Sequence, residues 1–119
     1  MSEKKVTLSL NFLHCYFVEE ENYDDVFLKY NGKKIWPKRK KQQAVMMDTT
    51  TPLNVEIRGI SLGQLVEIEL WDFDWLSSND LLGVFKMEIS ETTGAFTTDM
   101  IRNLEETEKA KYTLEWEVF

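Results

Sequence analysis

The sequence has a single cysteine, Cys15, and a single histidine, His14. One cysteine excludes an internal disulfide and a cysteine-built zinc site. One histidine leaves acid–base and nucleophilic catalysis short of its usual participant, so we expect no enzymatic activity. No apolar run approaches the about 20 residues of a membrane-spanning helix, and the first residues lack the apolar core of a signal peptide. These features favour a cytoplasmic binding domain.

The chain has 119 residues, of which 43% are hydrophobic, and this size suits one domain spanning 1–119. Apolar and polar residues alternate with the period of a β-strand along much of the sequence. Turn signals such as Asn31-Gly32 separate these segments. The strands are expected at 6–12, 26–30, 33–36, 43–47, 55–58, 66–70, 83–89 and 112–118.

The expected fold is therefore all-β: an antiparallel Greek-key β-sandwich of eight strands, or seven if one is absent. One short helix is also expected near residues 98–110. Met100, Ile101 and Leu104 would share one face of it, and Glu105 precedes Lys109 by four residues.

The net charge of -7 conceals a strong separation of charge along the chain. Residues 26–47 contain seven basic residues and no acidic one, whereas the remaining residues contain all 21 acidic residues. An overall acidic chain repels nucleic acid, so we expect no nucleic-acid partner. The basic segment nevertheless offers a local surface that attracts anions.

Three carboxylates gather in one expected loop, because Asp72 and Asp74 follow a strand and Asp80 precedes the next. Like charges that converge repel unless a cation lies between them. Flexible, oxygen-rich sites suit calcium better than magnesium, which demands a tighter octahedral geometry. An EF-hand is excluded, because its sixth and twelfth positions would be Ser77 and Gly83.

The spacing Asp72-x-Asp74-x5-Asp80-x-x-Gly83 closely resembles the third calcium loop of a C2 domain. Residues 24–30 resemble the Asp-Pro-Tyr-Val-Lys-Val stretch that ends the first calcium loop, with Asp25 at its aspartate. The resemblance extends over nearly the whole chain. It implies a C2-like fold and a docking module rather than an enzyme.

The resemblance also implies a set of ligands for one or two Ca²⁺ ions. Glu19 stands where the family often has aspartate, so it is the weaker candidate, and Asp24 supplements or replaces it. The carbonyl of Phe73 adds an oxygen at that loop position. The carboxylates that match the family's pattern directly are Asp25, Asp72, Asp74 and Asp80.

Two further groups of residues are candidates for contact with a lipid or a protein partner. Trp75 and Leu76 lie at the expected loop tip, where they would insert into a membrane interface, or fold back over Leu81 or Leu82 instead. Lysine-rich strands of C2 domains bind phosphoinositide headgroups or acidic proteins, although lysines also protect an exposed strand edge. The basic candidates are Lys33, Lys34, Lys38, Arg39, Lys40 and Lys41.

Two functions are therefore expected from the sequence. The first is a calcium-dependent module that docks on anionic phospholipid, which would make the protein peripheral to the membrane. The alternative is a calcium-independent interaction domain that binds an acidic protein partner within a larger assembly. The intact aspartates of the 72–80 loop favour the first, and Glu19 in place of aspartate favours the second.

Overall fold

The computed structural model describes residues 4–90 and 94–119. Within these residues the chain forms ten β-strands and no helix, so none of them provides a helix that could span a membrane. The strands are β1 (Lys5–Phe17), β2 (Tyr23–Tyr30), β3 (Lys33–Trp36), β4 (Gln43–Met46), β5 (Thr49–Ser61), β6 (Leu65–Asp72), β7 (Asp80–Glu88), β8 (Ala95–Asp99), β9 (Ile101–Arg102) and β10 (Lys111–Val118).

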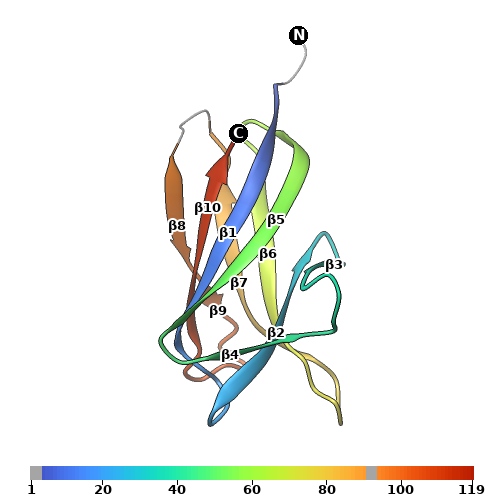
Figure 1. The fold of residues 1–119 in the computed structure, drawn as a ribbon, viewed down its shortest axis with the longest axis vertical. Helices are drawn as coiled ribbons and strands as arrows, with labels where there is room; N and C mark the ends of the chain where they lie inside the picture. Colours follow the sequence, from blue (N-terminus) through green and yellow to red (C-terminus); the bar gives the residue numbers. More distant parts are fainter. Residues whose placement is uncertain (1–3, 91–93) are drawn as a thin grey trace.

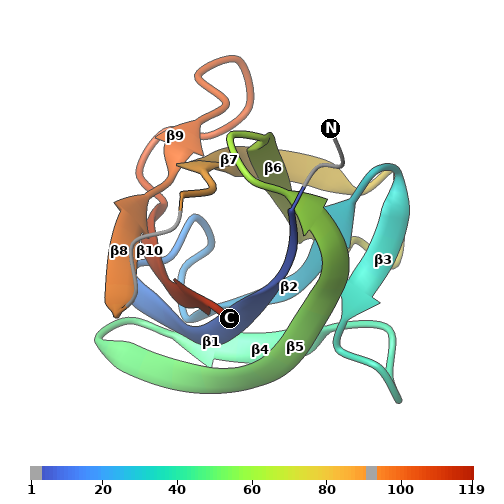
Figure 2. The ribbon, with the colours of Figure 1, turned by 90° about the horizontal axis from the view of Figure 1, so that it is seen from above.

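The strands form two antiparallel sheets that face each other (Figures 1 and 2). One sheet has the order β5-β1-β10-β8, and the other has the order β3-β2-β6-β7-β9, with β4 also paired to β2. Viewed along the long axis, the strands surround a common interior (Figure 2). The last strand of the chain lies beside the first, which brings β1 and β10 together at the centre of their sheet.

Alternation in the sequence becomes alternation of burial in the strands. In β6, Val66, Ile68 and Leu70 are fully buried while Glu67 is exposed. The inward residues of β1, β7 and β10 meet them from the other strands, so one apolar core holds the sheets together. Each strand expected from the sequence overlaps an observed one, and the all-β antiparallel sandwich is confirmed.

The prediction of a helix near residues 98–110 is wrong. Instead, β8 pairs with β10 and β9 pairs with β7, so the chain crosses from one sheet to the other at Met100. Of the expected apolar face, Met100 packs against the core, but Ile101 is 56% and Leu104 is 75% exposed. Backbone pairing with distant strands outweighs the local helical pattern here. Only a tight turn follows, in which the amides of Glu106 and Thr107 donate to the Asn103 carbonyl.

The fold brings three loops to one end of the sandwich, the lower end in Figure 1. They are the loop 18–22 between β1 and β2, the loop 73–79 between β6 and β7, and the segment 103–110 before β10. The acidic residues singled out in the sequence lie in or next to these loops. This end is therefore where a functional site is to be sought.

Gly83 in β7 provides a direct test of how closely the β8–β9 corner approaches β7. A Cβ at this position would collide with the Ile101 carbonyl oxygen and lie 2.6 Å from Cγ of Met100. The carbonyl belongs to a paired strand and cannot move freely, so Gly83→Ala should lower the free energy of unfolding by about 1–3 kcal/mol. Urea denaturation measures this loss.

Gly32→Asn is the control, because Gly32 has φ +76° with open space around it, a conformation that Asn tolerates. Equal stability of the two variants would contradict the close approach of Met100 and Ile101 to Gly83.

Candidate functional site: an acidic cleft

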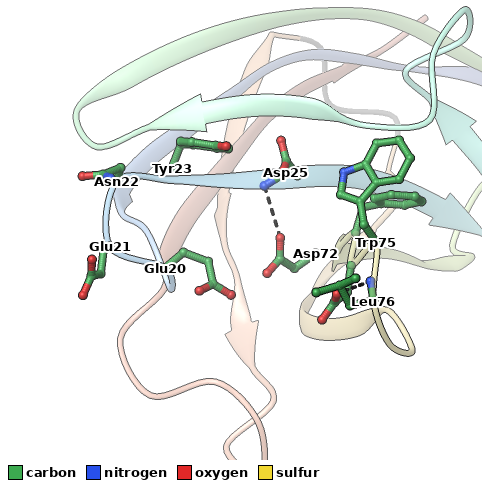
Figure 3. A pocket seen from close by; sticks show the side chains of 10 residues that line it. Glu20, Glu21, Asn22, Tyr23, Asp25, Asp72, Trp75 and Leu76 are labelled. Atoms are coloured by element: carbon green, nitrogen blue, oxygen red, sulfur yellow. Dashed lines mark hydrogen bonds between the residues drawn. The ribbon is translucent and has the colours of Figure 1, made fainter.

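A cleft with a volume of about 620 Å³ opens between the loop 18–22, the start of β2 and the loop 73–79 (Figure 3). Of the ten described residues that line it, five are acidic and none is basic. The other five lining residues are Asn22, Tyr23, Phe73, Trp75 and Leu76. We call this hollow the acidic cleft; its acidic residues are Glu20, Glu21, Asp25, Asp72 and Asp74.

Asp25 and Asp72 join the two loops at the base of the acidic cleft. The Asp25 amide donates a hydrogen bond of 3.1 Å to Oδ1 of Asp72, drawn as a dashed line in Figure 3. The Phe73 amide in turn donates to the Asp25 carbonyl oxygen at 2.6 Å. The backbone of Asp25 and the side chain of Asp72, 47 residues apart in sequence, are therefore held together.

The electrostatics of the cleft disfavour further negative charge. Burial raises the pKa of Asp72 to about 8, and the charges of Asp24 and Glu20 act in the same direction. Burial also raises the pKa of Asp25, with Asp24 contributing again. A bound cation would relieve this accumulation of charge.

Asp74 lies in the exposed loop and shapes its turn. Its carboxylate accepts hydrogen bonds from the Ser77 hydroxyl at 2.7 Å and from the Leu76 amide at 2.8 Å. These bonds, the Ser77 bond foremost, hold the pKa of Asp74 below its ordinary value. Asp74 is therefore ionised at neutral pH at the mouth of the cleft.

Asp80 begins β7 directly opposite Asp72, its partner in the strand register. Paired residues on neighbouring antiparallel strands project to the same face. Asp80 is nevertheless not among the residues that line the acidic cleft. The structure thus brings Asp25, Asp72 and Asp74 to the cleft and places Asp80 beside it.

Asp24 and Glu19, the other two candidate ligands, are used to anchor loops. The fully buried Asp24 carboxylate accepts hydrogen bonds from the amides of Glu19 and Glu20, and a 2.6 Å bond from the Tyr112 hydroxyl. Neither Asp24 nor Glu19 lines the acidic cleft.

Glu19 binds the segment that precedes β10. Its carboxylate accepts hydrogen bonds of 3.0–3.1 Å from the amides of Glu108, Lys109 and Ala110. Burial works to raise the pKa of Glu19, but these bonds outweigh it and hold the pKa below its ordinary value. The loop 18–22 is thus fixed by two acidic side chains of the protein itself.

Sequence reasoning missed Glu20, Glu21 and Tyr23, which line the cleft. The run of three glutamates at 19–21 was a usable signal, because it precedes a strand that carries Asp25. The anchoring role of Tyr112 gave no signal, since it depends on β10 lying beside β1.

The donor set of the acidic cleft suits a hard cation. Carboxylate oxygens are the ligands that calcium prefers, and no basic side chain lines the cleft to compete. Within residues 4–90 and 94–119, however, no three acidic, histidine or cysteine side chains already converge closely enough to hold a metal. Binding therefore requires Asp25, Asp72 and Asp74 to turn toward one another.

The loop tip lies beside one end of the basic segment, at Lys41. Trp75 and Leu76 are 68% and 97% exposed, and the Trp75 ring packs edge to face on Phe73, with the ring centroids 4.8 Å apart. Nζ of Lys41 lies 5.5 Å from the centroid of the Trp75 ring. All six basic candidates are exposed: Lys33, Lys34, Lys38, Arg39, Lys40 and Lys41.

No protein-family model matches the sequence, and no curated protein matches it significantly. Its structure is similar to that of a C2 domain from plant extended synaptotagmin 1, with a TM-score of 0.57 and 14% identity over 96% of this chain and 91% of that one. Another structure of a C2 domain matches with a TM-score of 0.56 and 12% identity, covering 97% of this chain and 98% of the other.

Human GIVD cytosolic phospholipase A2 is also similar, with a TM-score of 0.52 and 14% identity. The match covers 96% of this chain but only 16% of the phospholipase chain. At such identities the likeness is one of fold.

The raised pKa of Asp72 gives a prediction for the pH dependence of stability. From about pH 4 to about pH 8 the folded protein keeps a proton on Asp72 that the unfolded chain has lost, so this group makes stability fall as pH rises. Asp72→Asn preserves the acceptor for Asp25 and removes this dependence. We expect the free energy of unfolding of the variant to exceed that of the wild type by roughly 2–4 kcal/mol at the upper end of this pH range.

Urea denaturation in the presence of a chelator measures the difference across the pH range. Asp48→Asn is the matched control, because it removes the same charge from an exposed turn whose φ of +60° asparagine tolerates. If the free energy of unfolding of Asp72→Asn and of the wild type changed in parallel with pH, the pKa of Asp72 would not be raised in the folded protein.

Proposed function

Since the chain has the C2-domain fold, we propose that it is a membrane-docking module whose acidic cleft binds Ca²⁺ and whose loop tip enters anionic phospholipid. The observation that carries this proposal is that five acidic residues line one cleft beside an exposed tryptophan that is itself in contact with a lysine. The acidic cleft, the loop tip and Lys41 of the basic segment thus lie at one end of the molecule.

Asp25, Asp72 and Asp74 would hold the ion, with Glu20 and the Phe73 carbonyl next to them. The ion would supply positive charge that neutralises the cleft and attracts lipid phosphate. Asp72 gives up its proton when a cation enters, because the cation offsets the burial that raises its pKa. Glu19 and Asp24 are assigned to loop anchoring, and one ion is therefore expected rather than two.

The chain's own charges explain why docking would be conditional. The bare acidic cleft repels an anionic leaflet, whereas the exposed basic segment attracts it by about 1 kcal/mol for each residue near the surface. Trp75 and Leu76 add an apolar contact at the interface, where tryptophan is favoured. We propose that the module works in the cytoplasm and lies at the membrane surface when docked. Its proposed role is binding without catalysis.

A second candidate function is a calcium-independent interaction domain for an acidic protein partner. One observation favours it: Asp24 accepts hydrogen bonds from amides of loop 18–22, and Glu19 ties this loop to the amides of residues 108–110, so the loop is anchored without a metal. The basic segment would then provide the binding surface.

Co-sedimentation with phosphatidylcholine–phosphatidylserine vesicles tests the proposal. We expect binding of the wild type in calcium, little binding in chelator, and loss of calcium-dependent binding in Asp72→Asn/Asp74→Asn. Trp75→Ala/Leu76→Ala should weaken binding about tenfold, or about 1.4 kcal/mol, while calcium still raises the thermal stability of this variant.

Glu105→Gln/Glu106→Gln is the matched control, because it removes the same charge from a loop at the same end of the molecule. Equal sedimentation of the control and the Asp72→Asn/Asp74→Asn variant, with no effect of calcium on stability, would refute the cation site. Retention on an acidic protein but not on vesicles would establish the second function instead.

A further inference from the structure

A second hollow lies at the same end of the sandwich as the acidic cleft but uses different residues. It has a volume of about 390 Å³ and is lined by residues from the end of β1, the β8–β9 corner and the start of β10. Three of its lining residues are basic, and one, Asp99, is acidic. We call it the basic groove; its cations are Arg102, Lys109 and Lys111.

The three cations of the basic groove are not neutralised by close ion pairs. In the part of the chain that the structure describes, carboxylates form ion pairs with Arg58 and Lys86 and with none of these three. Glu19 is near Lys109 but is directed to the backbone amides of residues 108–110. The lining therefore carries three positive charges against one negative charge.

The position of Arg102 is fixed before any ligand arrives. Its Nη1 donates a 2.7 Å hydrogen bond to the Glu108 carbonyl oxygen, which leaves the other guanidinium donors available. The segment that carries this carbonyl is held by the Glu19 carboxylate and by the bond from the Asn103 amide to the Leu82 carbonyl. A preorganised arginine costs a ligand less ordering entropy than a mobile one.

The remaining walls determine what kind of anion fits. Phe17, 52% exposed, and Met100 add apolar surface to the groove. Nζ of Lys111 lies 5.2 Å from the centroid of the Tyr16 ring, which is outside the groove lining, so this lysine is held at the edge of the groove. An anion that carries a small organic group uses both kinds of surface.

We propose that the basic groove binds a phosphate monoester. Such a group has a charge near -2 at neutral pH, which matches the excess positive charge of the lining. The arginine fork binds its oxygens in a bidentate manner, and the lysines add point charges. The phosphate comes either from a lipid headgroup or from a soluble compound, and in both cases recognition requires no calcium and no residue of the acidic cleft.

Amide NMR of the labelled protein in the presence of a chelator tests the groove directly, with inositol trisphosphate as the soluble probe. We expect the amides of Arg102, Lys109 and Lys111 to shift with saturation. Arg102→Gln should weaken binding about tenfold or more, since hydrogen bonds to charged groups contribute about 1.5–3 kcal/mol. Arg102→Lys, which keeps the charge but loses the fork, should give a smaller loss.

Lys109→Gln/Lys111→Gln is a second variant that leaves Arg102 and its contact with Glu108 intact, and it should also weaken binding. The control, Arg58→Gln/Lys86→Gln, changes the net charge equally at a distance and should bind as the wild type does. Chelator removes any contribution of a metal in the acidic cleft. Absence of phosphate binding under these conditions therefore does not affect the proposed calcium-dependent membrane function, and absence of calcium binding does not affect the basic groove.

Phosphatidylcholine vesicles that contain phosphatidic acid form the second arm of the experiment. Binding to these vesicles that depends on Arg102 assigns a lipid headgroup, and binding to the soluble probe alone assigns a free phosphate compound. The proposal is overturned if the groove amides do not shift with either probe, or if the groove variants bind as tightly as the Arg58→Gln/Lys86→Gln control.

Discussion

The end of the sandwich that carries the candidate site depends on one contact, the hydrogen bond from the Asp25 amide to the Asp72 carboxylate. This bond and the Phe73–Asp25 backbone bond hold the loops 18–22 and 73–79 together. The contact places a carboxylate in a partly desolvated position next to other carboxylates, which is unfavourable without a proton or a cation. Binding of a proton or a cation would therefore stabilise the cleft.

Acidic residues at this end serve two different purposes. Asp24 and Glu19 satisfy backbone amides of neighbouring segments and so replace the ordering that a bound ion would provide. Asp25, Asp72 and Asp74 face the cleft, and no basic side chain lines it to offset their charge. Residue type and spacing alone do not separate these roles, because both use the same carboxylate. The difference arises from burial and from which amides lie within reach.

Most of the fold could be predicted from the sequence because burial in a sandwich alternates with the strand period. The segment 66–70 and the strand at 112–118 are clear examples. The corner at Met100 could not be predicted, because β8 and β9 are held by pairing with distant strands rather than by their own pattern. A local spacing of apolar residues there favoured a helix, and tertiary pairing overrode it.

The candidate site was predictable only in part. The position of Asp72 at a strand end and the resemblance around Asp25 indicated that the two loops would meet. The contributions of Glu20 and Tyr23 depend on how the loop 18–22 is anchored by Asp24, which no pattern reveals. The basic groove is likewise assembled from the end of β1, the β8–β9 corner and the start of β10, and in the sequence its three cations are interspersed with glutamates.

The most direct test of the cation site is a residue-resolved NMR titration of the protein with calcium. The account predicts that the amides of Asp25, Phe73 and Asp74 shift together along a single saturation curve for one ion. Shifts confined to the acidic segment 105–108, or the absence of any saturable change, would contradict a site shared by the two loops.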